Sequence, residues 1–200
     1  DRAAVAFDLK APTFRHNLYA QYKGNRSPMP DELHMQIPII QEILDKAGIQ
    51  LLMMEGFEAD DILGTIAKRH AHQGDEVTVL SGDRDLLQLA EENLKILIPK
   101  TKKGGTELET YFPADVEAKY GVSPDGYLQM KALMGDPSDN IPGVPAIGEK
   151  TAAKIIQEYQ SVENAIAHAA QVKPARAGQN LEEFQEQARL SLTLATICAD

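Results

Sequence analysis

Short apolar runs alternate with longer stretches of helical periodicity through the first hundred residues. Apolar residues recur every three or four positions over 31–47 and 58–72, which predicts two amphipathic helices, the first kinked or shifted at its start by Pro38. Four apolar runs are short enough to be buried strands: 3–7, 51–54, 77–80 and 94–98. Strands separated by helices predict an α/β fold with a largely parallel sheet flanked by helices.

Beyond residue 99 the pattern changes to helices alone. The basic segment from Lys100 to Gly105 has the composition of a hairpin tip. The polar, Pro- and Gly-containing stretch 170–180 predicts a flexible connector. Periodicity predicts helices at 113–119, 124–134, 149–158, 161–169 and about 180–197. We therefore expect an α/β core over residues 1–112 and a helical subdomain over 113–200.

Composition narrows the class of protein. With 43% hydrophobic and 25% charged residues among 200, the chain has the composition of a globular protein. It has no run of 18 apolar residues, so we expect no membrane span, and the first residues carry no targeting signal, so we expect a cytoplasmic location. Its one cysteine, Cys198, excludes an internal disulfide and a multi-cysteine zinc site.

Acidic residues gather where predicted strands end or helices begin. The carboxyl ends of parallel strands meet at one sheet edge, so the acids that follow them should converge there. Each group alone is better explained by helix-dipole or turn preferences, but together such carboxylates would repel one another unless cations neutralised them. Oxygen-only ligands favour Mg²⁺ or Mn²⁺. The candidate metal ligands are Asp8, Glu58, Asp60, Asp61, Asp83, Asp85, Asp136 and Asp139.

Because so many of the acids are among the candidate metal ligands, the negative net charge does not exclude a polyanionic partner. The formal charge of −10 would argue against a polyanionic partner, but removing the eight acids leaves −2. Residues 9–30, which we call the basic arm, contain no Asp or Glu. Arg15, Tyr22, Lys23 and Arg26, with Tyr19, have the spacing of one helix face. They fit either a solvated surface helix or a phosphate clamp with rings for base stacking, and the lack of acids favours the clamp.

A glycine-containing turn directly precedes the predicted helix at 149–158. Gly143 and Gly148 precede it, and Lys150 and Thr151 stand in its first turn. Backbone N–H groups at a helix start, with these side chains, suit a sequence-independent grip on a phosphate backbone, although a structural corner between two helices has the same pattern. Its position directly after Asp136 and Asp139 favours the phosphate grip.

Several motifs in order resemble the 5′ nuclease family of bacterial DNA polymerase I, related to flap endonucleases. The resemblance covers essentially the whole chain. It is carried by Phe7-Asp8, Ala11-Pro-Thr-Phe-Arg-His, Tyr22-Lys23, Arg26, Glu58-Ala-Asp-Asp, Ser81-Gly-Asp-Arg-Asp-Leu, Gly135-Asp-Pro-Ser-Asp-Asn-Ile-Pro-Gly and the helix-hairpin-helix segment 143–154.

The resemblance implies a PIN-like 5′ nuclease fold with two Mg²⁺ or Mn²⁺ ions. Arg15 and Lys23 would act as catalytic cations at the base of a helical arch, with Tyr22 and Arg26 also binding DNA. The helix-hairpin-helix, about 141–158, would bind the duplex. Its carbonyl oxygens would also bind a K⁺ ion. The first ion would take Asp8, Glu58, Asp60 and Asp61, and the second Asp83, Asp85, Asp136 and Asp139.

The implied activity is two-metal hydrolysis of DNA at 5′ flaps or 5′ ends, as in Okazaki primer removal and repair. The family also implies a monomer, near the bacterial nucleoid, with a polymerase downstream. The family has a further strand and a metal-site Asp upstream, so this chain is expected to be a fragment of a longer protein with a weakened first metal site. Ala146 replaces a usual glycine and would cost about 1 kcal/mol if its φ is positive.

Two other functions were weighed against the nuclease. A non-catalytic, structure-specific DNA-binding module would keep the basic arm and use the acids only structurally. A small-molecule phosphohydrolase with an Asp-x-Asp nucleophile would need an acid at Lys10 and would not need the basic arm. If the chain is a nuclease, the carboxylates are needed for cleavage. A binding module does not cleave DNA and uses the carboxylates only structurally.

Overall fold

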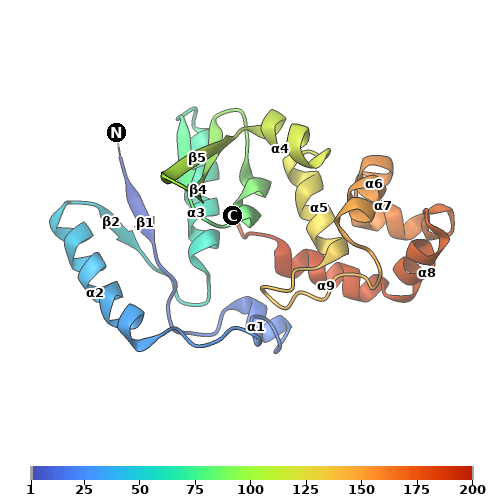
Figure 1. The fold of residues 1–200 in the computed structure, drawn as a ribbon, viewed down its shortest axis with the longest axis horizontal. Helices are drawn as coiled ribbons and strands as arrows, with labels where there is room; N and C mark the ends of the chain where they lie inside the picture. Colours follow the sequence, from blue (N-terminus) through green and yellow to red (C-terminus); the bar gives the residue numbers. More distant parts are fainter. Residues whose placement is uncertain (1, 200) are drawn as a thin grey trace.

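The computed structural model describes residues 2–199, which form two small sheets and a group of helices (Figure 1). The predicted α/β architecture with helices around the strands and a helical second half is confirmed. No helix within residues 2–199 has the length and apolar character needed to cross a membrane. The helices of the second half are α4 (Pro113–Tyr120), α5 (Pro124–Met134), α6 (Glu149–Tyr159), α7 (Val162–Ala167), α8 (Ala175–Glu183) and α9 (Gln185–Ala195), with a short 3₁₀ turn η2 (Ala169–Gln171).

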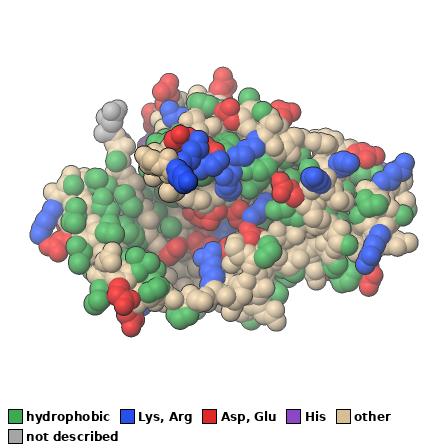
Figure 2. Space-filling view, in the orientation of Figure 1, with side chains coloured by type: hydrophobic (Ala, Val, Ile, Leu, Met, Phe, Trp, Pro, Cys, Tyr) green, Lys and Arg blue, Asp and Glu red, His purple; other side chains and the backbone are tan. Residues whose placement is uncertain are grey.

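A first lobe contains β1 (Ala4–Ala6), β2 (Gln50–Leu52) and α2 (Asp31–Lys46). The two strands pair in parallel, with Val5 opposite Leu51. Pro38 lies inside α2, so the helix continues through it. No residue of α2 is buried, and this side of the molecule shows many exposed hydrophobic side chains (Figure 2).

The second sheet contains β3 (Val77–Leu80), β4 (Leu94–Lys102) and β5 (Gly105–Tyr111). Strands β3 and β4 are parallel, while β4 and β5 form the hairpin expected at the basic turn, with Lys102 opposite Gly105. Two of the three strand pairs are parallel, as expected, but the strands form two separate sheets rather than one. No strand of residues 2–199 lies between the first lobe and β3, and Leu80 at the end of β3 is 61% exposed.

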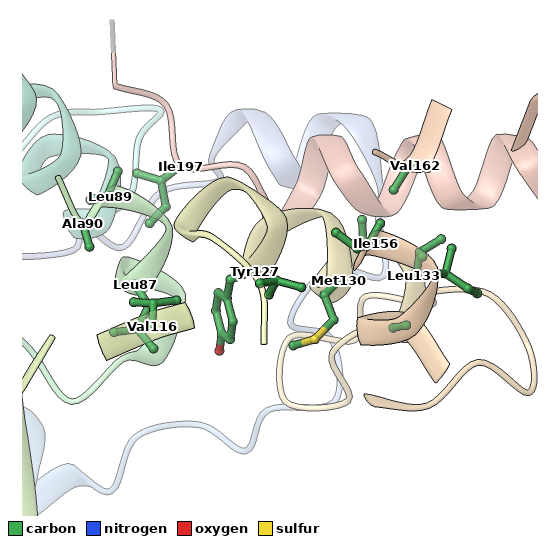
Figure 3. Close-up of a cluster of buried hydrophobic side chains, with 14 of the residues drawn as sticks. Leu87, Leu89, Ala90, Val116, Tyr127, Met130, Leu133, Ile156, Val162 and Ile197 are labelled. Atoms are coloured by element: carbon green, nitrogen blue, oxygen red, sulfur yellow. The ribbon is translucent and has the colours of Figure 1, made fainter. Parts of the chain in front are cut away.

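One hydrophobic core joins the second sheet to the helices (Figure 3). Helix α3 (Ala59–His72) and the 3₁₀ helix η1 (Arg84–Leu89) pack on the sheet side. Helix α5 is central, because it contacts η1 on one side and α6 and α9 on the other. Leu87, Met130 and Leu133 are almost completely buried in this core. The acids flanking these elements are therefore carried on a rigid base.

The stretch 170–180 is not the flexible connector that its composition predicted. Helix α8 begins at Ala175, directly after Pro174, and buries Ala177 and Leu181. Gly178 packs so closely that an added Cβ would lie 2.2 Å from the carbonyl oxygen of Ala169. Tertiary packing of this small-residue face outweighs the weak local preference for helix.

Ala146 has a φ of +62°, the left-handed conformation that glycine adopts without strain. Ala146→Gly is therefore expected to raise the free energy of unfolding by about 1 kcal/mol. The same change at Ala118, exposed within α4, should lower it by about 0.5–1 kcal/mol, because glycine is costly inside a helix. Urea denaturation of both variants checks the pair, and equal signs would contradict the assignment of strain to Ala146.

Candidate active site

Carboxylates from both predicted groups line one small pocket of about 20 Å³, enough for a water-sized occupant. Figure 2 shows acidic side chains gathered in a hollow at the centre of this face. Asp8, at the end of the first strand, accepts a hydrogen bond from the N–H of Ala59 (2.7 Å) at the start of α3. The carboxylates that line the pocket are Glu58, Asp60, Asp83, Asp85 and Asp139.

Burial, with neighbouring carboxylates, leaves two of these groups poorly stabilised as anions. Burial, together with the charges of Asp83 and Asp8, raises the pKa of Asp60 to about 7. Burial raises the pKa of Asp85 to about 6, with Asp83 adding to the effect and Lys131 opposing it. A bound cation would relieve both, and this is the physical argument that the donor set fits a divalent metal.

Arg15 and Asp61 form a buried ion pair, each 2% exposed. Two guanidinium nitrogens donate to the two Asp61 oxygens at 2.8 Å, and Arg15 also donates to the carbonyls of Leu194 (2.9 Å) and Thr196 (2.6 Å). Burial alone would raise the pKa of Asp61, but the hydrogen bonds from Arg15 hold it below its usual range. The N–H of Cys198 donates to Asp61 as well (2.9 Å).

This pairing differs from the sequence-based roles of both residues. The Asp61 oxygens already accept hydrogen bonds from Arg15, Cys198 and the N–H of Glu58 (2.9 Å), so both are occupied within the protein. Arg15 also lines the acidic pocket, but its guanidinium is already paired with Asp61 and with backbone carbonyls. The pair instead fixes the C-terminal segment 194–198 against the start of α3.

The basic arm is not the single helix that its spacing predicted. Helix α1 contains only Phe14–Leu18, and turns follow it. Tyr22 is 3% exposed and donates to Glu58 (3.0 Å) and Asp139 (3.2 Å), so its ring is not available for base stacking. Burial and these carboxylates raise the pKa of its hydroxyl. Lys23 donates to Glu58 at 2.7 Å, and Arg26 pairs with Asp139.

The 19–26 turn is joined to the 136–141 loop by hydrogen bonds. Lys23 has a φ of +53°, and its N–H donates to the carbonyl of Asp139 (2.8 Å). This contact stabilises the left-handed conformation that local sequence disfavours. Three more bonds join the segments: Asn140 Nδ2 to Gln21 O (2.7 Å), Asn25 Nδ2 to Pro137 O (2.6 Å) and Arg26 Nε to Ser138 O (3.3 Å).

Asn140 is thus a positioning residue for Lys23, and Asn140→Gly should separate this role from backbone strain. Glycine accepts the φ of +57° at this position but loses the hydrogen bond to Gln21. For the DNA cleavage that the family resemblance implies, we expect kcat to fall about 10–100-fold, as for other outer-shell partners, with KM little changed. Gln160→Gly is the matched control, since Gln160 has a φ of +66° and a local side-chain hydrogen bond away from the site. Equal effects at both positions would contradict the positioning role.

Lys131 is a site residue that the sequence analysis missed. Its side chain, on the buried face of α5, contacts Asp85 (2.8 Å) and Asp136. Burial alone would lower the pKa of Lys131, but these two carboxylates raise it, so the ammonium form is retained. A charged residue in the otherwise apolar helical pattern of α5 was the signal that could have found it.

The glycine turn is only partly available as a phosphate grip. Gly143 is buried and its N–H donates to Ser191 Oγ (3.0 Å), so this predicted DNA-binding N–H is already used. Gly148 is the exposed N-cap of α6, and Lys150 is exposed beside the half-buried Thr151. The carbonyl of Gly148 accepts from the N–H of Thr151 (3.0 Å), which starts the helix. The start of α6 therefore remains the surface suited to a phosphate.

Two ammonium groups lie among the candidate metal ligands in this conformation. Within residues 2–199, no group of three or more Asp, Glu, His or Cys side chains is arranged to hold one ion. Lys23 lies between Glu58 and Asp139, and Lys131 lies between Asp85 and Asp136. These ammonium groups balance part of the negative charge.

The raised pKa values of Asp60 and Asp85 predict a pH dependence of stability in EDTA. A group whose pKa is higher in the folded state stabilises the fold when protonated, and this contribution is lost as the pH rises through the folded pKa. The two groups should therefore lower Tm as the pH rises from 5 to 8, through about 6 and about 7. A Tm series in EDTA checks this, and an Asp60→Asn/Asp85→Asn variant should show a shallower decline. Parallel curves would contradict it.

Comparison with known proteins identifies the family. Residues 1–121 match the 5′-3′ exonuclease N-terminal resolvase-like domain, and residues 122–200 match the 5′-3′ exonuclease C-terminal SAM fold. The chain belongs to the 5′-3′ exonuclease family. The two family matches meet near the end of α4, whereas our boundary at 112/113 stays a prediction.

The relatives of this member of the family include much longer proteins. It is 47% identical over 196 residues to DNA polymerase I of Bacillus subtilis (strain 168), a match that covers 98% of the chain and 22% of that polymerase. It is 44% identical over 202 residues to the thermostable DNA polymerase I of Thermus thermophilus, covering 100% and 23%. The chain thus spans about a fifth of the length of these relatives.

Solved structures of 5′ nucleases share the fold. T5 5′-exonuclease with bound zinc ions superposes with a TM-score of 0.81 at 26% identity, covering 98% of this chain and 74% of that one. The catalytic core of Rad2 in complex with DNA substrate gives a TM-score of 0.55 at 15% identity, covering 91% and 56%. The latter likeness concerns the fold alone.

Proposed function

We propose that this chain is a divalent-metal-dependent 5′ nuclease that hydrolyses DNA phosphodiester bonds at 5′ flaps or 5′ ends of duplexes. The observation that carries the proposal is the pocket lined by carboxylates from both predicted groups, with Lys23 and Arg26 fixed at its rim. Its relatives include a 5′-exonuclease with bound divalent ions, which supports a metal requirement. Removal of Okazaki primers and DNA repair in the bacterial cytoplasm are the roles that fit this activity.

The carboxylates and cations have separate roles in this proposal. Asp8, Glu58 and Asp60 would hold the first Mg²⁺ or Mn²⁺ ion, while Asp61 supports them through Arg15. The second ion would be held by Asp83, Asp85, Asp136 and Asp139. When bound, such ions supply an activated water and stabilise the leaving 3′ oxygen, giving a 5′-phosphate and a 3′-hydroxyl.

The chain's own cations would bind and orient the substrate. Lys23 and Arg26 already lie against the carboxylates through exchangeable ion pairs, so a DNA phosphate can compete for them. Lys150, Thr151 and the backbone at the start of α6 would hold the duplex backbone. A K⁺ ion bound by carbonyl oxygens of the helix-hairpin-helix turn stays part of the proposal.

The direct test is a cleavage assay of the 200-residue chain on a 5′-flap duplex, with Mg²⁺ and with EDTA, beside a binding titration in Ca²⁺. Flap release that requires Mg²⁺ supports the proposal. Binding without cleavage, from a chain shown by circular dichroism to be folded, would favour a non-catalytic DNA-binding module. Neither binding nor cleavage would contradict both functions.

A further inference from the structure

Three cations surround a single carboxylate on the β4–β5 hairpin, beside the acidic hollow. Lys100 Nζ lies 2.8 Å from Glu109, Lys119 Nζ lies 3.3 Å from it, and an Arg84 guanidinium nitrogen lies 3.6 Å from it. We call Arg84, Lys100 and Lys119 the hairpin cation cluster. The ratio of cations to carboxylates is opposite at the surface site around Arg189, where one cation contacts two carboxylates, Glu163 and Glu186.

Aromatic groups and hydrogen bonds hold the hairpin cation cluster in place. Arg84 donates to the Tyr120 hydroxyl at 2.8 Å, and Lys119 contacts the Tyr111 hydroxyl. The Lys119 ammonium also lies 4.8 Å from the centre of the Tyr111 ring. Hydrogen bonds from Lys100 and the other neighbours hold the pKa of Glu109 at about 2, so the carboxylate stays charged and the local net charge is positive.

The cluster adjoins the acidic pocket in both sequence and space. Arg84 stands between Asp83 and Asp85, two residues that line the pocket. Figure 2 shows Lys and Arg side chains over the hairpin along the border of the hollow that holds the acids. The side chains of Arg84, Lys100 and Lys119 are 39–49% exposed, so a strand leaving the pocket can reach them.

We propose that the hairpin cation cluster binds a backbone phosphate of the DNA whose reacting phosphate occupies the acidic pocket. This inference rests on the proposed function. Charge is the main argument, because three partly exposed cations around one carboxylate leave a local excess of positive charge in a chain of net charge −10, and this attracts a DNA backbone that lies at the pocket.

The test measures the affinity of the 200-residue chain for a 5′-flap duplex in Ca²⁺ at several NaCl concentrations. Arg84→Gln/Lys119→Gln should weaken binding several-fold and reduce the slope of log K against log[NaCl] by about 0.9, the value for one phosphate contact. Lys46→Gln/Arg189→Gln removes the same charge from distant, exposed ion pairs and should leave the slope unchanged. Equal changes in both double variants would overturn the inference.

A second variant reverses the sign of the expected effect. Glu109→Gln removes the one carboxylate while Tyr111 and Tyr120 still hold Lys119 and Arg84, so DNA binding should tighten. Weaker or unchanged binding by a folded Glu109→Gln chain would overturn the cluster assignment. If the unaltered chain cleaves flaps but the slopes do not differ, only this inference fails, whereas failure to bind DNA at all overturns the proposed function too. A cluster that binds inorganic phosphate without affecting the DNA slope is a small-anion site, and the inference is then wrong.

Discussion

Asp60→Asn is expected to lower flap cleavage in Mg²⁺ by about a thousandfold or more while raising Tm in EDTA. The rate falls because a carboxylate that contributes several kcal/mol of charge stabilisation through a metal is lost, and each 1.36 kcal/mol is about tenfold in rate. Stability rises because burial and the charges of Asp83 and Asp8 disfavour the Asp60 anion, as its pKa of about 7 indicates. An amide of the same shape carries no such charge.

Opposite changes in activity and stability distinguish this prediction from general damage to the fold. Asp45→Asn, at an exposed position near the end of α2, is the matched control and should change neither quantity appreciably. Single-turnover cleavage and thermal melts in EDTA provide the two measurements. Cleavage within about twofold of the unaltered rate would show that Asp60 does not act in the reaction.

Arg15→Met is expected to cost about 3–5 kcal/mol of unfolding free energy, the range for removing one partner of a buried ion pair. Both residues are 2% exposed, so Asp61 would keep a charge without its principal partner. The change also removes the hydrogen bonds from Arg15 to Leu194 and Thr196. Urea denaturation measures the loss, and the rate of cleavage should fall with the loosened site.

Two comparisons make the Arg15 prediction specific. The double variant Arg15→Met/Asp61→Leu removes both charges and should recover part of the stability, since a buried pair replaced by apolar groups is often tolerated. Arg189→Met breaks an exposed pair with Glu163 and should cost much less. A loss below about 1 kcal/mol for Arg15→Met, or no recovery in the double variant, would contradict a buried, coupled pair.

The sequence correctly predicted those helices and strands that are determined by residues close together in the chain. The strand at 77–80 and the helix at 124–134 have the bounds that periodicity indicated, because apolar spacing and Pro124 at a helix start are local features. Five of the eight candidate carboxylates meet in one pocket, as expected for those that follow strands, although those strands lie in two separate sheets. The pocket contains acids from three separate segments.

The features that could not be predicted from the sequence depend on contacts between distant segments of the chain. Lys23 takes a left-handed conformation because Asp139, over a hundred residues away, accepts its N–H, so the helical spacing of the basic arm was misleading. Arg15 and Asp61 carry opposite charges that sequence places in two different functional motifs, and only their burial makes them partners. The division of the strands into two sheets likewise depends on which distant segments of the chain pair with one another.

The Arg15 hydrogen bonds also set an order in time for a chain synthesised from its N-terminus. Arg15 and the Thr196 carbonyl are 181 residues apart. At about 5–20 residues per second, roughly 10–35 s separate their synthesis on a ribosome. The acids at 8, 58–61 and 83–85 emerge early, but the contact that fixes Arg15 and Asp61 cannot form until residues 194–198 have left the exit tunnel. The site of the nascent chain is therefore completed only after residues 194–198 have been synthesised.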